Sequence, residues 1–126
     1  MNPAHEPVAT TGPVRQFVTP GIVPQAQTLD QLRSKIDDLD EQIVTLLAQR
    51  ALCVRDATRF KIDAMQVSAP QRQAVVFARV RALAAQHETD FPGLSDIIEA
   101  AYRTLVAGFI AGEERFFHET EPIPPC

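Results

Sequence analysis

The chain has 126 residues, a mass of 13.9 kDa and a formal net charge of −4, which predicts one small domain. This acidic balance argues against a nucleic-acid-binding protein, because such proteins usually present a basic face. The sequence has no apolar run near the roughly 20 residues of a membrane helix and no signal peptide, so we expect a cytoplasmic protein without a membrane partner.

Proline separates two terminal segments from a central domain. Five of the ten prolines lie in residues 3–24, and three lie in the last five residues. Residues 1–27 also lack apolar periodicity, so we expect a flexible arm that buries too little surface to offset its ordering entropy. The tail, residues 120–126, is expected to be flexible for the same reason, which leaves residues 28–119 as the helical domain.

The first predicted element is a long helix over residues 28–63. Thr28, followed by Gln31, matches a capping box. Apolar side chains then recur at steps of three and four, at Leu32, Ile36, Leu39, Ile43, Leu46, Cys53, Ala57 and Phe60. This spacing indicates a helix, and strand-like alternation is scarce throughout, so the predicted fold class is all-α.

Two shorter helices are predicted after the long one. Ser68 and Gln71 form a second capping-box pattern, which predicts a helix that ends near Gln86. A third helix is predicted over residues 94–118. A helix of about 35 residues is about 50 Å long, and two shorter helices cannot cover its apolar stripe from end to end. We therefore expect a homodimer of three-helix chains in which the long helices pack together.

The candidate site residues are charges that interrupt or flank the apolar pattern. Arg50 falls on the stripe of the first helix, and Lys61, three helical turns later, is expected on the same face. Arg33 points about 100° away from Arg50, so it could serve only the pocket of a neighbouring protomer. Arg72 lies in the first turn of the second helix, and Glu113 lies on the stripe of the third.

Buried charges are costly without partners, and two interpretations satisfy this requirement. In the first, Arg50 and Glu113 form a structural ion pair and the other cations are solvated. In the second, the cations form a pocket for a small dianionic ligand, because they outnumber the single carboxylate. The sequence shows no nucleophilic triad or phosphate loop and no metal-ligand spacing, so we expect no metal site.

The stretch LDQLRSKIDDLDEQIVTLLAQRALCVRDATRFK, with the later APQR and FIAGEERFF, resembles the all-α chorismate mutase family over about residues 28–118. The resemblance implies an intertwined homodimer with two active sites, each built from both protomers. It also implies a pericyclic rearrangement of chorismate, a small dicarboxylate, to prephenate without covalent catalysis and without a cofactor or metal. The RFK, APQR and FIAGE segments are closer to the isochorismate-pyruvate lyase branch, which yields salicylate and pyruvate.

The same resemblance implies roles for the candidate residues. Arg33 would come from the partner chain and bind one substrate carboxylate, while Arg50 would bind the other. Lys61 would hold a carboxylate and donate to the ether oxygen of the substrate. Arg72 would orient the ring side, and Gln73 stands where family members have a Glu that receives the ring hydroxyl.

Two positions depart from the family pattern. Glu113 stands where the mutases commonly have a Gln that donates to the ether oxygen. A carboxylate cannot donate but a protonated carboxyl can, so we expect Glu113 to act in its protonated form. Ala69 replaces an Asp of many mutases, which favours the lyase, whereas Gln73 favours the mutase. A non-catalytic helical dimer that serves as a ligand-binding or interaction module is the alternative from another class.

Overall fold

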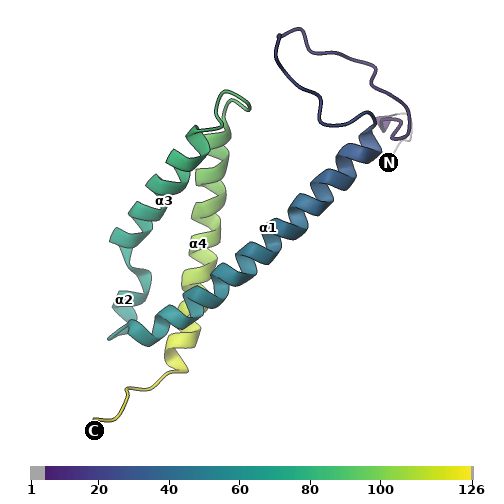
Figure 1. The fold of residues 1–126 in the computed structure, drawn as a ribbon. Coiled ribbons are helices and arrows are strands. Elements are labelled where there is room, and N and C mark those ends of the chain that lie inside the picture. The colour runs from purple at the N-terminus through teal and green to yellow at the C-terminus, as the bar shows by residue number, and fades with distance from the viewer. Residues whose placement is uncertain (1–4, 126) are drawn as a thin grey trace. The chain divides into compact units, whose positions relative to one another are not determined.

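The computed structural model describes residues 5–125. The regular elements in this range are helices, and it contains no strand, as predicted (Figure 1). The elements are α1 (Leu29–Ala57), the 3₁₀ turn η2 (Thr58–Phe60), α2 (Ala64–Ser68), α3 (Pro70–Ala85) and α4 (Leu94–His118). Within the described range, no helix is both long and apolar enough to cross a membrane. The chain divides between Ala48 and Gln49 into two compact units, and α1 contributes to both.

The first unit contains the start of α1, which Thr28 caps as predicted. The Thr28 hydroxyl oxygen accepts a hydrogen bond from the backbone N–H of Gln31 at 3.2 Å. The Gln31 side chain in turn accepts from the N–H of Gln27 at 2.9 Å, one residue earlier than in the standard capping box. Both bonds satisfy backbone donors that have no partner within the helix.

The segment before α1 makes two further hydrogen bonds to that helix. The Asp30 N–H donates to the Ala9 carbonyl at 2.9 Å, and the Lys35 ammonium donates to the Gln25 carbonyl at 2.5 Å. Residues 6–27 are otherwise irregular. The flexibility expected of this arm stays a prediction.

The apolar stripe of α1 is solvent-exposed in the single chain. Four of its five large side chains within the first unit are at least 51% exposed, namely Ile36, Leu39, Ile43 and Leu46, whereas Leu32 is half-buried. Exposed apolar surface of this extent on one helix face is typical of a protein–protein contact.

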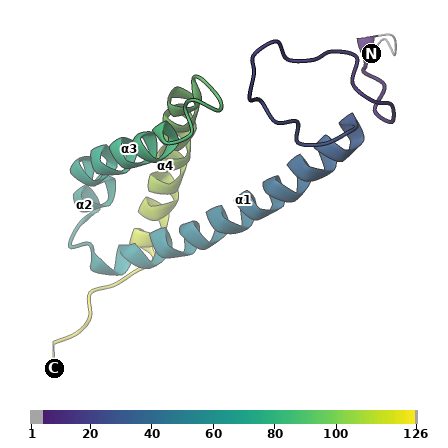
Figure 2. The same ribbon diagram turned by 45° about the horizontal axis from the view of Figure 1, so that its top comes forward.

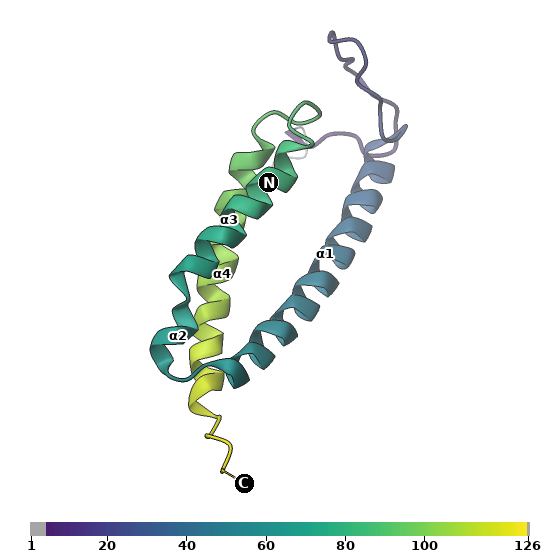
Figure 3. The same cartoon turned by 60° about the vertical axis from the view of Figure 1, so that its left-hand side comes forward.

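In the second unit, α3 and α4 lie side by side in every view, connected by the loop over residues 86–93 (Figure 3). The buried apolar side chains are Val67, Val80, Ala84 and Val106, which come from α2, α3 and α4. The loop is closed by Glu88, whose carboxylate accepts from the N–H groups of Gly93 at 2.7 Å and Ser95 at 3.1 Å. Because these donors lie at the start of α4, Glu88 caps that helix, which spans the residues predicted for it.

The prediction of one helix over residues 28–63 is wrong at its C-terminal end, because α1 ends at Ala57. The hydroxyl of the buried Thr58 donates to the Arg55 carbonyl at 2.7 Å, a local bond that competes with continued helix. After the η2 turn, Lys61 has an extended backbone with φ −96° and ψ 134°. Lys61 is therefore not on the helical face of α1, and the three-turn spacing does not apply to it.

The second predicted capping box, at Ser68, is also wrong. Ser68 is the last residue of α2, and α3 is preceded by Ala69, which has a left-handed backbone (φ 39°, ψ 63°) and makes no side-chain cap. Ala69 is the single residue between the two helices, so α2 lies next to the start of α3 (Figure 2). Pro70 occupies the first position of α3, where its missing N–H has no cost.

Candidate active site

The largest concentration of predicted site residues lies at one pocket of about 350 Å³ in the second unit. It is formed by the end of α1, by Lys61 directly after η2, and by residues of α2, α3 and α4. Five of the six candidate residues line it, namely Arg50, Lys61, Arg72, Gln73 and Glu113. Ala57 and Ala69 also line it, and their small side chains leave space between the charged groups.

Arg33 lies apart from these five in the chain, on the exposed surface of α1 in the first unit. Its assignment to the pocket of a partner protomer stays a prediction.

Glu113 is the buried acidic group of the pocket. It lies on α4 with only 7% of its surface exposed. Its Oε1 lies 4.0 Å from the Lys61 Nζ, and among residues 5–125 Lys61 is the ion-pair partner of this carboxylate. The interpretation of Arg50 and Glu113 as a structural ion pair is therefore wrong. Lys61 takes that place because the η2 turn packs against α4 and delivers the following residue to Glu113.

Burial raises the pKa of the Glu113 carboxyl, and the Lys61 ammonium opposes that rise without cancelling it. Burial acts in this direction because it penalises the charged form of an acid. The carboxyl therefore keeps its proton to a higher pH than an exposed glutamate does. In that form it can donate a hydrogen bond into the pocket, which an ionised carboxylate cannot do.

Arg50 is held by aromatic rings. Its guanidinium carbon lies 5.1 Å from the ring centre of Phe109 and 5.8 Å from that of Tyr102, both on α4. Both distances are within the range of cation–π attraction. Sequence reasoning missed this contact, because it depends on how the end of α1 lies against α4.

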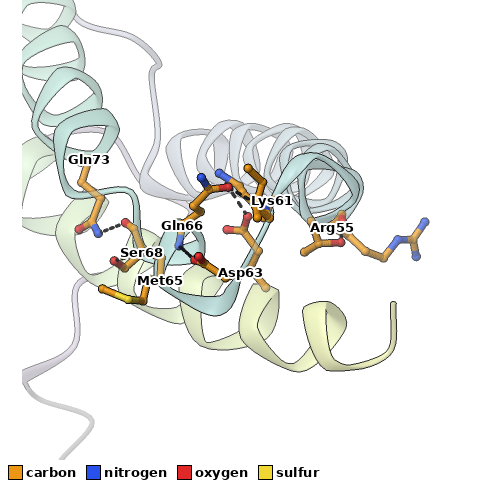
Figure 4. Close-up of polar contacts among 10 residues, drawn as sticks. Arg55, Lys61, Asp63, Met65, Gln66, Ser68 and Gln73 are labelled. Atoms are coloured by element: carbon orange, nitrogen blue, oxygen red, sulfur yellow. Dashed lines mark hydrogen bonds and ion pairs between the residues drawn. The ribbon is translucent and has the colours of Figure 1, made fainter. Parts of the chain in front are cut away.

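The segment that carries Lys61 is held by hydrogen bonds that sequence reasoning did not predict. Asp63 caps α2 by accepting from the Gln66 N–H at 3.1 Å, and the Gln66 side chain accepts from the Ile62 N–H at 2.7 Å. Figure 4 shows these groups gathered beside Lys61, whereas Arg55 points away from them. An aspartate three residues before a glutamine is the signal that could have predicted this short capped helix.

The start of α3 supplies the remaining polar groups. Arg72 lies in its first turn, near the positive end of the helix dipole. The side-chain amide of Gln73 donates to the Ser68 carbonyl (Figure 4). That bond occupies one amide hydrogen and fixes the side chain, whose carbonyl oxygen can still accept a hydrogen bond.

The balance of charge in the pocket suits an anionic ligand. Three cations face one carboxyl, and that carboxyl is itself shifted toward its neutral form. Paired arginine and lysine donors bind carboxylates through charge-assisted hydrogen bonds. Residues 5–125 contain no cluster of three histidine, cysteine or acidic side chains that could hold a metal ion.

Comparison with known proteins agrees with this geometry. The family model for chorismate mutase type II matches residues 32–114. The chorismate mutase of Methanocaldococcus jannaschii is 25% identical over 96 residues, which cover 75% of this chain and 93% of that protein. The isochorismate pyruvate lyase of Pseudomonas aeruginosa is 27% identical over 92 residues, which cover 73% of this chain and 87% of that protein. The chain therefore belongs to the chorismate mutase type II family.

Proposed function

We propose that the protein is a chorismate mutase that converts chorismate to prephenate. The observation that carries this proposal is the pocket lined by Arg50, Lys61, Arg72 and the buried Glu113. Chorismate has two carboxylates and one ether oxygen. The pocket offers cations for the carboxylates and a protonated carboxyl for the ether oxygen, and membership of the family supports the same assignment.

In this mechanism the protein supplies neither nucleophile nor base. Arg50 and Arg72 hold the substrate with its side chain folded over its ring, which removes most of the entropic barrier. The ether C–O bond then breaks as the new C–C bond forms, and negative charge grows on the ether oxygen. Lys61 and protonated Glu113 donate to that oxygen, and this stabilisation in the transition state is the main electrostatic contribution.

The proposal includes a homodimer. A second copy would cover the exposed stripe of α1 and bring its own Arg33 to the pocket. If so, a mixture of inactive Arg33→Ala and Arg50→Ala chains should regain activity, because each mixed dimer has one pocket with both arginines intact. A site that uses Arg33 from its own chain would regain none. Light scattering on the wild-type protein and on Ile43→Glu, which places a charge in the stripe, measures the dimer itself.

Isochorismate-pyruvate lyase is the second candidate. Ala69 lines the pocket without a carboxyl group, and the Pseudomonas aeruginosa lyase is as similar to this chain as the archaeal mutase is. Cleavage to salicylate and pyruvate also breaks an ether C–O bond, so the same cations would serve it.

A product assay separates these candidates. The purified protein is given chorismate and isochorismate separately, at about pH 5 and at about pH 7.5, because the lower pH favours the protonated form of the Glu113 carboxyl. Prephenate from chorismate supports the mutase, and salicylate from isochorismate with little prephenate supports the lyase. Absence of both products contradicts both enzymes and favours a non-catalytic helical module that binds another small dianion.

A further inference from the structure

We propose that Tyr102 and Phe109 are positioning residues, which hold the Arg50 guanidinium by its face and leave its N–H edges free for a substrate carboxylate. This inference rests on the proposed function and adds two residues to its site. The two rings are seven residues apart on α4, which places them on one face about two turns from each other. Arg50 comes from α1, so the rings fix a group delivered by another helix.

Contact with aromatic rings, instead of with a carboxylate, leaves the charge of Arg50 available to a ligand. Within residues 5–125 the ion pair of Glu113 is with Lys61, and no ion pair is recorded for Arg50. A carboxylate partner would neutralise the guanidinium and occupy the donors that the substrate needs. An aromatic face attracts the cation but accepts none of its in-plane hydrogen bonds, so the charge and the donors both remain available.

The two rings also provide a matched comparison. Phe109 lines the pocket, so its replacement changes both the Arg50 contact and the pocket wall. Tyr102 does not line it, so its replacement should act on the site through Arg50 alone. Arg103 lies over Phe77 at 4.4 Å, a closer cation–π pair that also lies outside the pocket. Phe77→Leu is therefore the control for losing a ring–arginine contact without a role in positioning.

The test compares Tyr102→Leu, Tyr102→Phe and Phe77→Leu with the wild type. Tyr102→Leu should lower kcat/KM for chorismate by about 5-fold to 30-fold, which is the range of a partly desolvated cation–π contact. Most of this loss should appear in KM, because Arg50 binds a carboxylate that does not react. Tyr102→Phe keeps the ring and should remain within about twofold of the wild type, as should Phe77→Leu.

A second readout does not require activity. The Arg50 side-chain Nε–Hε signal, assigned by comparison with Arg50→Lys, should be shifted upfield by the ring currents of both aromatic residues. It should move toward the position of exposed arginines in Tyr102→Leu and stay in place in Tyr102→Phe and Phe77→Leu. Titration with malate, a small dicarboxylate, should perturb this signal less in Tyr102→Leu than in the wild type.

The two proposals fail in different ways. A wild-type protein that turns over neither chorismate nor isochorismate overturns the proposed function, while the Arg50 signal still decides the positioning role. An Arg50 signal that is unmoved by Tyr102→Leu overturns the positioning role, even in an active enzyme. Equal losses of kcat/KM in Tyr102→Leu and Phe77→Leu also overturn it, because they would show a general effect on packing.

Discussion

Replacement of Glu113 by Gln should remove the pH dependence of the proposed reaction. The wild-type carboxyl is buried, and its pKa is raised by that burial against the opposing charge of Lys61. Only its protonated form can donate to the ether oxygen. The wild-type rate should therefore fall as pH rises through this pKa, by about tenfold for each pH unit once the carboxylate dominates. A glutamine amide donates at every pH, so the variant should give a flat profile.

The size of the effect follows from the pocket. One donor aimed at a developing oxyanion contributes a factor of about 10² to 10³ to kcat. The wild-type rate should therefore fall by this factor in total between low and high pH. The ionised carboxylate also attracts the Lys61 ammonium. At the observed 4.0 Å this attraction amounts to about 1 kcal/mol in water and about 4 kcal/mol at an effective dielectric constant of 20. Ionisation thus removes one donor and draws the second toward Glu113.

The assay follows the loss of chorismate absorbance between about pH 4.5 and pH 8.5 at constant ionic strength, where carboxyl groups with raised pKa values titrate. Glu113 is the one carboxyl among the residues that line the pocket, so the profile reports on this group. Glu113→Ala provides the rate without any donor, and circular dichroism at each pH confirms that the chain stays folded. A flat wild-type profile, or a Gln variant that keeps the wild-type slope, would refute the reasoning.

The raised pKa of Glu113 should also make the free energy of unfolding depend on pH. Between the ordinary and the raised pKa of Glu113, the folded protein binds more protons than the unfolded chain does. The free energy of unfolding should therefore fall as pH rises through that window, and Glu113→Gln should lack this contribution. Urea titrations of both proteins across the same pH range would measure the difference, and parallel curves would contradict the raised pKa.

Three further substitutions test separate parts of the structure. Arg50→Ala should lower kcat/KM by about 30-fold to several thousandfold. It should leave the free energy of unfolding within about 1–2 kcal/mol of the wild type, because Arg50 contacts aromatic rings. A loss of about 3–5 kcal/mol would instead indicate a broken buried ion pair. Ala69→Gly should increase the free energy of unfolding by about 1 kcal/mol and so raise the urea midpoint, because glycine adopts the left-handed backbone without strain. An unchanged midpoint would show that Ala69 is not strained. Glu88→Gln should lower thermal stability at neutral pH, because a neutral amide accepts more weakly from Ser95 and Gly93. Hydrogen bonds from Ser95 and Gly93 lower the pKa of Glu88. The stabilisation by the Glu88 carboxylate is therefore present above the ordinary glutamate pKa and is lost as pH falls through the lowered pKa. A Glu88→Gln variant that remains less stable than the wild type in acid would contradict this.

The sequence by itself determined the features that depend on near neighbours along the chain. Sequence patterns predicted the helical class and a third helix over residues 94–118, which is α4 in the structure. The Thr28 cap followed from a side chain and a backbone donor three residues apart. The end of α1 escaped this reasoning because the apolar pattern continues through Phe60, while a hydroxyl bond at Thr58 has already turned the chain.

The tertiary structure alone decided how the site residues pair. Charge pattern selected four residues that line one pocket, Arg50, Lys61, Arg72 and Glu113, but it left open whether Glu113 pairs with Arg50, whereas the structure pairs Glu113 with Lys61. This pairing joins an extended residue after η2 to Glu113 on α4, about fifty positions later in the chain. The aromatic support of Arg50 likewise depends on contact between two helices. Periodicity assigns a residue to a face, but only packing between distant segments determines which group it meets there.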